Sequence, residues 1–273
     1  MKPARQRDHR SRRKWRFVMP GRRDSNPRLR LMQRDMTLLA DLFWHRLMSS
    51  GQILRLGYFS SLSRCNRRLN QLRKGGLVLP YPEVPSVTGL SQVVRISRPG
   101  MLVLLERGRV KRTDAYVSYP EPSRSMAVHT LSIVQVRCLL SSPNIDLVMW
   151  LPEGRCRHEY FVSGSNTARI FKPDAYAEIR SERGRTSFFI EVDLANSSRR
   201  QIEEKLRSYE RYQKETFGET YGKKNFKVLF VTTTAGRCRQ LECWCQGTSI
   251  PTVAAPFDGL PERIRELVGG SRR

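Results

Sequence analysis

The sequence predicts an α+β chain with two parts, an N-terminal winged helix-turn-helix unit followed by a small α/β domain. Between residues 34 and 105, three helical segments with apolar stripes precede two short alternating strands. Between residues 125 and 232, the patterns run in the order αβββαβ, which favours a mixed sheet. A chain of 273 residues is long enough for two modest domains, and one compact unit is the alternative.

The charge of the chain indicates a polyanionic partner. Lys and Arg exceed Asp and Glu by 25, with +11 over residues 1–34, +8 over 35–117 and +6 over 118–273. Cationic side chains gain affinity by displacing counterions from phosphates. Nucleic acid is therefore the leading candidate, and an anionic membrane surface is a distant second. Double-stranded DNA is the form expected once the winged unit described below is considered.

Residues 1–33 are expected to form a disordered basic arm. The stretch is dense in arginine, is interrupted at Pro20, Gly21 and Pro27, and has few apolar residues. Such a composition cannot bury enough surface to offset the entropy lost on ordering. Phosphate contact or insertion into a minor groove is favoured over a purely solubilising tail.

Residues 34–112 are expected to form the winged unit. Apolar residues at helical spacing predict a first helix over 34–47, and Ser49 or Ser50 can cap a short second helix. Ser61 or Ser63 then opens a strongly basic third helix, which ends at Gly75-Gly76. The strands of a hairpin are predicted over 77–81 and 93–96, and a short closing helix over 99–105.

The third helix is the expected DNA-contacting element, because in such a fold it enters the major groove while the wing touches the backbone. The candidate contacts are its polar side chains: Arg64, Asn66, Arg67, Arg68, Asn70, Gln71, Arg73 and Lys74. Two alternatives stay open. The first is that the unit is a three-helix bundle whose basic face is only solvated. The second is that it is a winged domain that binds protein.

Residues 113–124 are polar, carry two prolines, and are expected to link the winged unit to a second domain over 125–273. Its predicted elements are a helix over 126–140, strands over 146–151, 170–179 and 186–194, a helix over 197–217 and an apolar strand over 227–232. Pro173 lies near the start of the second of these strands.

Three carboxylates fall on two neighbouring predicted strands: Asp174 on one, and Glu191 and Asp193 on the other. Side chains two residues apart in a strand share a face, so all three are expected within reach of one metal ion. Such oxygens suit Mg²⁺ or Mn²⁺, which neutralises a phosphodiester and activates water. Lys205 on the next helix is the candidate for stabilising developing charge, and Gln201 lies one turn before it.

The alternative for this site is structural. Asp174 then caps a turn, Glu191 and Asp193 pair with cations, and no metal binds. Two carboxylates in the apolar strand FFIEVDLA are costly to bury without cations, which favours an inherited or active site. His129 and His158 are interpreted as packing or capping residues, with a role of His129 beside the site left open.

The six cysteines are scattered through a chain of ordinary domain size, which predicts reduced thiols. Cys238, Cys243 and Cys245, even with Cys156 and His158, match no paired C-x2-C spacing, so we expect buried structural thiols and no zinc. No apolar run approaches the roughly 18 to 20 residues of a membrane span, and the N-terminus lacks the apolar stretch of a signal peptide. We therefore expect a cytoplasmic protein associated with the nucleoid or a plasmid.

Pro173-Asp174 and Glu191-Val192-Asp193 resemble the PD-(D/E)xK nuclease superfamily, which implies a restriction-endonuclease-like domain. The chain departs from that pattern at Asp193, which stands where the superfamily places lysine. Lys205 would then supply a migrated lysine, a variation that the superfamily shows.

The chain as a whole resembles the replication-relaxation family of plasmid and mobile-element proteins over about residues 34–232. The resemblance rests on RDMTLLADLFWHRLMSSGQIL, RRLNQLRKGGLV, AVHTLSIVQVRCLL, KPDAYAEI and FFIEVDLANSSRRQIEEKLRSY. It implies a DNA-binding protein with a degenerate nuclease-like domain, acting in replication, maintenance or mobilisation beside other replication or mobilisation proteins.

Two other functions stay open. One is an active Mg²⁺-dependent endonuclease or nickase that uses Asp174, Glu191, Asp193 and Lys205. The other is a winged-helix transcriptional repressor whose second domain serves only for oligomerisation, which leaves a homodimer open.

Overall fold

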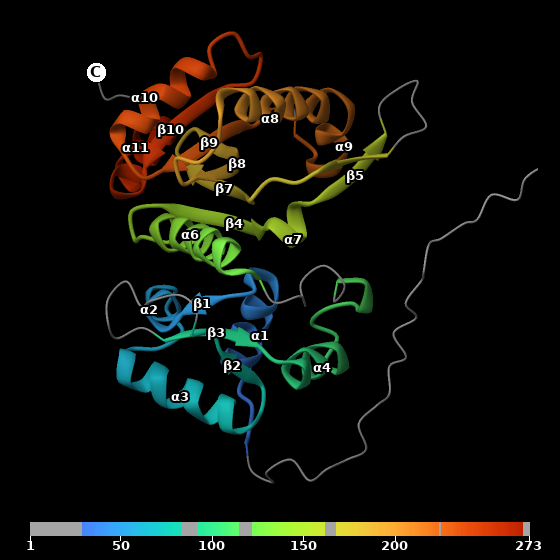
Figure 1. Cartoon of the computed structure of the whole chain (residues 1–273), viewed down its shortest axis with the longest axis vertical. Coiled ribbons are helices and arrows are strands. Elements are labelled where there is room, and N and C mark those ends of the chain that lie inside the picture. The colour runs from blue at the N-terminus through green and yellow to red at the C-terminus, as the bar shows by residue number, and fades with distance from the viewer. Residues whose placement is uncertain (1–28, 83–91, 115–121, 162–167, 224, 270–273) are drawn as a thin grey trace, which may run out of the picture.

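The computed structural model describes residues 29–82, 92–114, 122–161, 168–223 and 225–269, and these form a mixed α and β structure (Figure 1). The α+β class predicted from the sequence is confirmed. Most of the expected basic arm and linker lies outside the described residues. At the end of the arm, Leu29 and Leu31 pack against the core of the N-terminal unit.

The N-terminal unit consists of helices and a small sheet in the order α1 (Gln33–His45), β1 (Met48–Ser49), α2 (Ser50–Arg55), α3 (Leu62–Lys74), β2 (Val78–Pro80), β3 (Val93–Ile96) and α4 (Arg98–Glu106). Side-chain caps fix where the helices begin. The Ser49 hydroxyl accepts a hydrogen bond from the backbone N–H of Gln52 at 3.2 Å, and Ser61 does the same for Arg64 at 3.3 Å. Of the two serines expected at the start of each helix, Ser49 and not Ser50 caps α2, and Ser61 and not Ser63 caps α3.

The strands of this unit form an antiparallel sheet in the order β1-β3-β2. The hairpin of β2 and β3 was expected, whereas β1 is only two residues long and carries no alternating pattern that would predict it. The apolar faces of α1, α2 and α3 pack together over this sheet, with Leu38, Leu42, Ile53 and Leu69 almost fully buried.

The second unit is built on a five-stranded mixed sheet in the order β10-β9-β8-β7-β4. Its strands are β4 (Asp146–Pro152), β7 (Ala175–Ser181), β8 (Gly184–Asp193), β9 (Lys227–Thr232) and β10 (Thr252–Pro256). The first three are antiparallel neighbours, while β8, β9 and β10 run parallel. Helices α6 (Arg124–Leu140) and α11 (Leu260–Gly269) cover one face, and α8 (Arg199–Tyr212) and α10 (Ala235–Trp244) cover the other (Figure 1).

The strand predicted over 170–179 is divided into two. β6 (Ala168–Phe171) pairs with β5 (His158–Phe161) in a separate ribbon, and β7 begins only at Ala175. Pro173 lies in the break, where a residue without a backbone N–H cannot donate to a sheet ladder. The break matters for the site because it places Asp174 directly before β7.

The helix predicted over 197–217 also changes character along its length. α8 ends at Tyr212, and the chain continues as a π-helix (Gln213–Phe217) and then α9 (Gly218–Tyr221). Further elements were not predicted from the sequence: α7 (Glu153–Cys156), β5, α10, β10, a 3-10 turn (Phe257–Gly259) and α11.

Helix α6 lies between the two units and packs on both (Figure 1). Val134 and Cys138 belong to the core of the N-terminal unit, whereas Ile133 and Val136 belong to the core beneath the sheet. A helix that is apolar on opposite faces is one that is covered from both sides. One helix therefore supplies side chains to two hydrophobic cores.

Polar contacts join the units beside α6. The Arg137 guanidinium donates to the Asp41 carboxylate at 2.6 Å and to Nε2 of His45 at 3.0 Å, and the Tyr58 hydroxyl donates to Asp41 at 2.5 Å. The His45 ring stacks on Trp150 of β4 with ring centroids 6.3 Å apart. Burial lowers the pKa of His45 to about 3, and the neighbouring Arg137 charge adds to the effect. His45 is therefore neutral over most of the acid range.

Five of the six cysteines are buried and, contrary to expectation, Cys243 is exposed because it lies on the outer side of α10. None of the six forms a disulfide, and all lie within the described ranges. Within the part of the chain that the structure covers, no helix combines the length and the apolar character that crossing a bilayer would take.

Candidate functional site

The candidate site lies where β7 begins and β8 ends. Ala175 pairs with Ile190 in the antiparallel ladder, so Asp174 and Glu191 occupy the next positions along the two strands. The Asp174 carboxylate accepts a hydrogen bond from the backbone N–H of Val192 at 2.8 Å. Asp174 is therefore held by a hydrogen bond to the neighbouring strand, close to Glu191.

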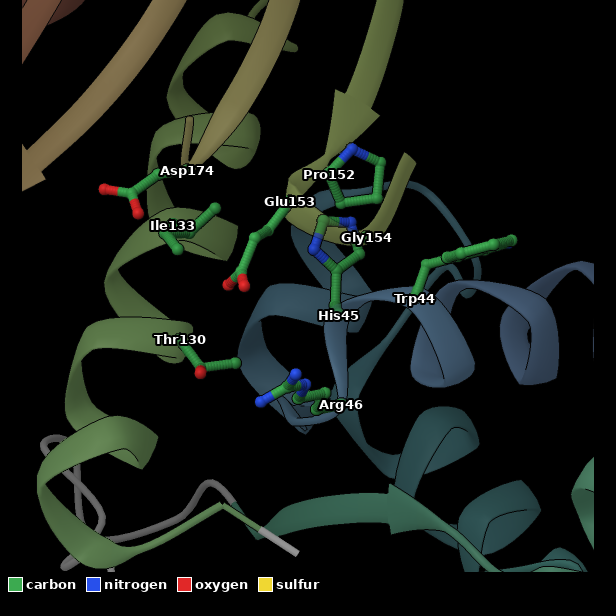
Figure 2. A pocket seen from close by; sticks show the side chains of 9 residues that line it. All are labelled: Trp44, His45, Arg46, Thr130, Ile133, Pro152, Glu153, Gly154 and Asp174. Atoms are coloured by element: carbon green, nitrogen blue, oxygen red, sulfur yellow. The ribbon is translucent and has the colours of Figure 1, made fainter. Parts of the chain in front are cut away.

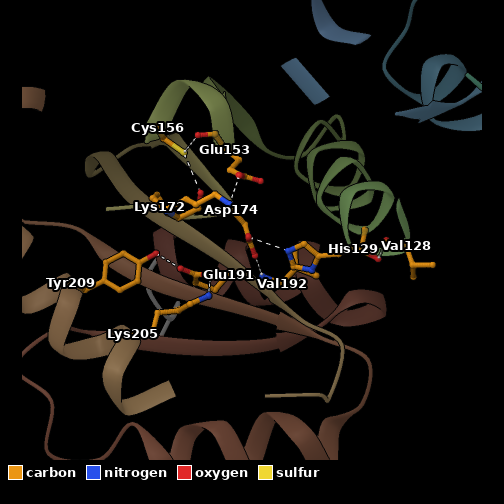
Figure 3. Close-up of polar contacts among 12 residues, drawn as sticks. Val128, His129, Glu153, Cys156, Lys172, Asp174, Glu191, Val192, Lys205 and Tyr209 are labelled. Atoms are coloured by element: carbon orange, nitrogen blue, oxygen red, sulfur yellow. Dashed lines mark hydrogen bonds and ion pairs between the residues drawn. The ribbon is translucent and has the colours of Figure 1, made fainter. Parts of the chain in front are cut away.

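His129, near the start of α6, contacts the other oxygen of this carboxylate. Its Nε2 lies 3.0 Å from Asp174 Oδ1 (Figure 3). Burial alone would raise the pKa of Asp174, but the hydrogen bond from His129 and the charge of Lys205 outweigh it, so the pKa is lowered. The same hydrogen bond raises the pKa of His129. The histidine thus belongs to the site, a role that the sequence left open.

Glu191 is 2% exposed and is held from α8. Lys205 forms an ion pair with one of its oxygens, and the Tyr209 hydroxyl donates to the other at 2.5 Å (Figure 3). Lys205 and Tyr209 are four residues apart, so they lie on one face of the helix. Burial raises the pKa of Glu191 to about 7, although the Lys205 charge opposes this shift. The site combines two carboxylates, a lysine, a tyrosine and a histidine.

Asp193 is bound elsewhere, although it shares a strand face with Glu191. Its carboxylate accepts a hydrogen bond from Nε of Arg237 at 2.6 Å and one from the backbone N–H of Ser197 at 3.3 Å. Arg237 comes from α10 and is itself only 9% exposed. The hydrogen bond from Arg237 is part of why the pKa of Asp193 is lowered despite burial, which alone would raise it.

Gln201 also lies outside the cluster of charged groups. Its side-chain oxygen accepts a hydrogen bond from the backbone N–H of Ser198 at 2.7 Å, as the second half of a capping box at the start of α8. Of the predicted catalytic set, the structure brings together Asp174, Glu191 and Lys205. It directs Asp193 to α10 and Gln201 to the helix cap.

The sequence indicates Tyr209 and His129 only weakly. It does not indicate Arg237, the partner of Asp193. Tyr209 extends the helical stripe of Lys205, and His129 opens the helix that precedes the sheet. Arg237 lies 44 residues after Asp193, in helix α10, which the sequence does not predict. No local pattern connects Arg237 to Asp193.

The site fits a divalent cation only in part. Within the ranges that the structure describes, no three His, Cys, Asp or Glu side chains are grouped so as to hold a metal ion. Asp174 and Glu191 present hard oxygens from adjacent strands, and Mg²⁺ in proteins is commonly held by one or two carboxylates together with water and phosphate oxygens. Asp193, the third expected ligand, is engaged with Arg237.

The candidate DNA contacts on α3 fall into two groups. Six side chains are exposed: Arg64, Arg67, Asn70, Gln71, Arg73 and Lys74. The other two are half-buried and bind residues of other segments. Asn66 accepts a hydrogen bond from Gln92 at 3.1 Å, and Arg68 binds the fully buried Asp35 of α1 through Nε at 3.1 Å and Nη2 at 2.5 Å. Arg68 thereby fixes α3 to α1.

The fold and the site define a mixed α/β protein with a cluster of two carboxylates and a lysine, of which Glu191 is buried, at the end of a central sheet. The chain belongs to the replication-relaxation family, whose model matches residues 39–229, a span that runs from α1 into β9. Membership suggests a role in the replication or relaxation of plasmids or other mobile elements, and so a DNA-related context. No curated protein and no solved structure matches the chain.

Proposed function

We propose that this chain is a DNA-binding protein of a plasmid or other mobile element, acting in replication, maintenance or mobilisation. The observation that carries the proposal is the division of α3 into two faces. Cys65, Leu69 and Leu72 are buried in the core, while the exposed face holds Arg64, Arg67, Asn70, Gln71, Arg73 and Lys74. A cationic helix face with amide side chains between the charges suits a contact with phosphates and base edges.

The surrounding fold supports this role for α3. Three helices followed by an antiparallel hairpin, with a third strand between the first two helices, is the order of a winged helix-turn-helix. In such units the last of the three helices enters the major groove. Figure 1 shows α3 at the outer side of the N-terminal unit, away from the five-stranded sheet, where a duplex can approach it.

Two contacts hold the helix for this purpose. Arg68 ties the middle of α3 to Asp35 of α1, and Asn66 ties its first half to Gln92, which directly precedes β3. A recognition helix needs a fixed orientation, because its side chains must meet several phosphates and bases at once. In this proposal Asn66 and Arg68 position the helix, and the six exposed side chains contact DNA.

A binding experiment tests this function. Full-length protein is titrated against a labelled duplex at several salt concentrations, together with Arg67→Ala and the control Arg265→Ala on α11. We expect affinity to fall steeply with salt, and Arg67→Ala to weaken binding and to reduce the salt slope by about one. Duplex binding that is insensitive both to salt and to Arg67→Ala would refute the proposal.

The second unit is proposed to be a degenerate nuclease-like domain. The order α6, β4, β7, β8, α8, β9, with β7 and β8 antiparallel and β8 and β9 parallel, supports a restriction-endonuclease-like core. The departure at Asp193 supports degeneracy, because the residue at the lysine position is an acid that a buried arginine holds. The unit then serves to bind DNA or partner proteins of replication or mobilisation.

A second candidate function is a metal-dependent endonuclease or nickase, which the convergence of Asp174, Glu191 and Lys205 favours. Asp174 and Glu191 would hold Mg²⁺ or Mn²⁺, which when bound neutralises the phosphate and activates water. Lys205 would stabilise charge that develops on the phosphate. His129 and Tyr209 would orient the two carboxylates through the hydrogen bonds that they make with them.

Incubation of supercoiled plasmid with the protein and Mg²⁺ or Mn²⁺ decides between the two candidates. Metal-dependent nicking or linearisation that is lost in both Asp174→Ala and Glu191→Ala would establish the enzyme. A duplex that shifts in a gel without any metal-dependent product would leave the binding function alone.

A further inference from the structure

The second unit carries an open groove that shares no residue with the Asp174 site. Its volume is about 520 Å³, whereas the pocket at the junction of the units, lined by Asp174 and Glu153 among others, has about 20 Å³ (Figure 2). The junction pocket therefore holds roughly one water-sized group, and the groove has room for a larger ligand. We call it the α8 groove. It is lined by Glu210, Arg211, Gln213, Lys214, Asn225 and Ser249.

The lining of the α8 groove limits the class of ligand. All six side chains are polar or charged, and none is aromatic or aliphatic. Pockets for apolar ligands are lined mainly by hydrophobic and aromatic side chains, and a nucleotide base is commonly held by stacking on an aromatic ring. The groove therefore suits a polar ligand that is recognised through charge and hydrogen bonds.

The groove contains two cations, Arg211 in the last turn of α8 and Lys214 in the π-helix that follows. Neither forms an ion pair with a carboxylate of the residues that the structure describes. The Nε of Arg211 is buried and has no hydrogen-bond partner. A guanidinium carries five N–H donors and is normally surrounded by acceptors. An anion in the groove would supply acceptors to both cations.

The π-helix explains why Arg211 differs from the arginines at the other end of α8. Arg199 and Arg200 each pair with the glutamate four residues later. Arg211 is also followed four residues later by a glutamate, Glu215, but the α-helical spacing ends at Tyr212 and the two do not form an ion pair. Single π-helical turns in a helix are frequent at functional sites.

Glu210, the acid of the α8 groove, is held by the opposite wall. One of its oxygens accepts hydrogen bonds from the Thr248 hydroxyl at 2.9 Å and from the backbone N–H and hydroxyl of Ser249 at 2.9 and 3.0 Å. The bond from the Ser249 backbone contributes most to lowering the pKa of Glu210, so the carboxylate stays ionised. It fixes the segment before β10, and two cations against one acid leave the groove positive.

Phosphate is the anion that these groups suit best. The planar guanidinium of Arg211 can donate two parallel hydrogen bonds to phosphate oxygens, and the ammonium of Lys214 adds a point charge. Residues three apart are neighbours on a helix surface, so the two cations can meet one phosphate or two consecutive ones.

We infer that the α8 groove binds phosphate groups through Arg211 and Lys214. The phosphates belong to a nucleic-acid strand or to a free nucleotide, and the groove offers both the same chemistry. This inference goes beyond the proposed function, because it concerns neither the exposed face of α3 nor the Asp174 site.

Nuclear magnetic resonance of the arginine Nε–H groups tests the inference on the full-length protein. The Arg211 signal is assigned by its loss in Arg211→Lys, and pyrophosphate is titrated at physiological ionic strength. We expect a saturable shift of this signal, with an affinity that falls about tenfold in Lys214→Gln, the loss of one charge-assisted contact. Lys74→Gln, which changes an exposed lysine of α3, is the matched control and should leave the affinity unchanged.

An Arg211 signal that pyrophosphate does not shift, or an affinity that is the same in Lys214→Gln and Lys74→Gln, would overturn the inference. Parallel titrations with an oligothymidylate and with ATP distinguish the sources, because the natural one should saturate the Arg211 signal at the lower concentration. Failure of the proposed function gives a different result: duplex binding then ignores Arg67→Ala, while the Arg211 signal still responds to pyrophosphate.

Discussion

The carboxylate of Asp193 and the guanidinium of Arg237 meet at 2.6 Å in the interior, with side-chain exposures of 3% and 8%. In the proposed nuclease-like domain, Asp193 would stand where a nuclease of the PD-(D/E)xK type carries lysine, and this ion pair would occupy the position of a catalytic group. It connects the end of β8 to α10 and directs the acid away from Asp174 and Glu191.

Removing one partner of this pair should cost much more stability than removing both. Arg237→Ala leaves a buried carboxylate without its cation, and we expect the free energy of unfolding to fall by about 3 to 5 kcal/mol. Replacing both residues by apolar ones, Asp193→Leu with Arg237→Met, should restore most of the loss. Urea unfolding monitored by circular dichroism measures both effects. Equal losses in the single and the double variant would contradict a buried charge pair.

Acid should destabilise the junction through His45. Its pKa is about 3 in the folded chain and about 6.5 when unfolded, so between these values the unfolded chain binds a proton that the folded chain does not. Stability is therefore lost as the pH falls from about 6.5 toward 3, by up to about 1.4 kcal/mol per pH unit. His45→Gln should remove this component from a pH series of chemical unfolding. Identical pH profiles for the two proteins would count against the prediction.

Neighbouring arginines on α3 should behave in opposite ways. Arg68→Ala removes the closer of the two cations beside the buried Asp35 and leaves only Arg34, at 3.6 Å, which we expect to lower the free energy of unfolding by about 2 to 4 kcal/mol. Arg67→Ala removes an exposed side chain and should change stability by no more than about 0.5 kcal/mol. Chemical unfolding of both variants, beside their duplex affinities, checks the assignment. A stable Arg68→Ala protein would remove the positioning role.

The shared helix α6 should make the two units unfold together. Val134 is fully buried in the N-terminal core, and Val134→Ala should cost about 1 to 3 kcal/mol by leaving a cavity. Hydrogen exchange should show amides of the five-stranded sheet losing protection together with those of α1 and α3. Ala235→Gly, at the start of α10 and away from α6, provides a comparison. Loss of protection confined to the N-terminal unit would show that the units unfold separately.

Local chemistry explains which parts of the fold the sequence predicts well. The bounds of α3 follow from Ser61 as a cap and Gly75 as a stop, and both act within a few residues of where they stand. The register of Asp174 beside Glu191 follows from strand alternation. The break at Pro173 is harder to predict from the sequence, because a proline at the start of a strand and a proline between two strands give the same local pattern.

What the sequence did not predict depends on contacts between distant segments. Asp193 is hydrogen-bonded to Arg237, which lies 44 residues away in the sequence, and His129 is hydrogen-bonded to Asp174, which lies 45 residues away. Each pairing is decided by which helix covers which face of the sheet, and not by any spacing in the chain.

Helix α6 has a consequence for how such a chain can be inherited. Because its two sides complete two different cores, neither unit keeps a full interior when the other is exchanged or deleted. Genetic recombination between mobile elements would therefore transfer the two units together, with the recombination boundary outside α6.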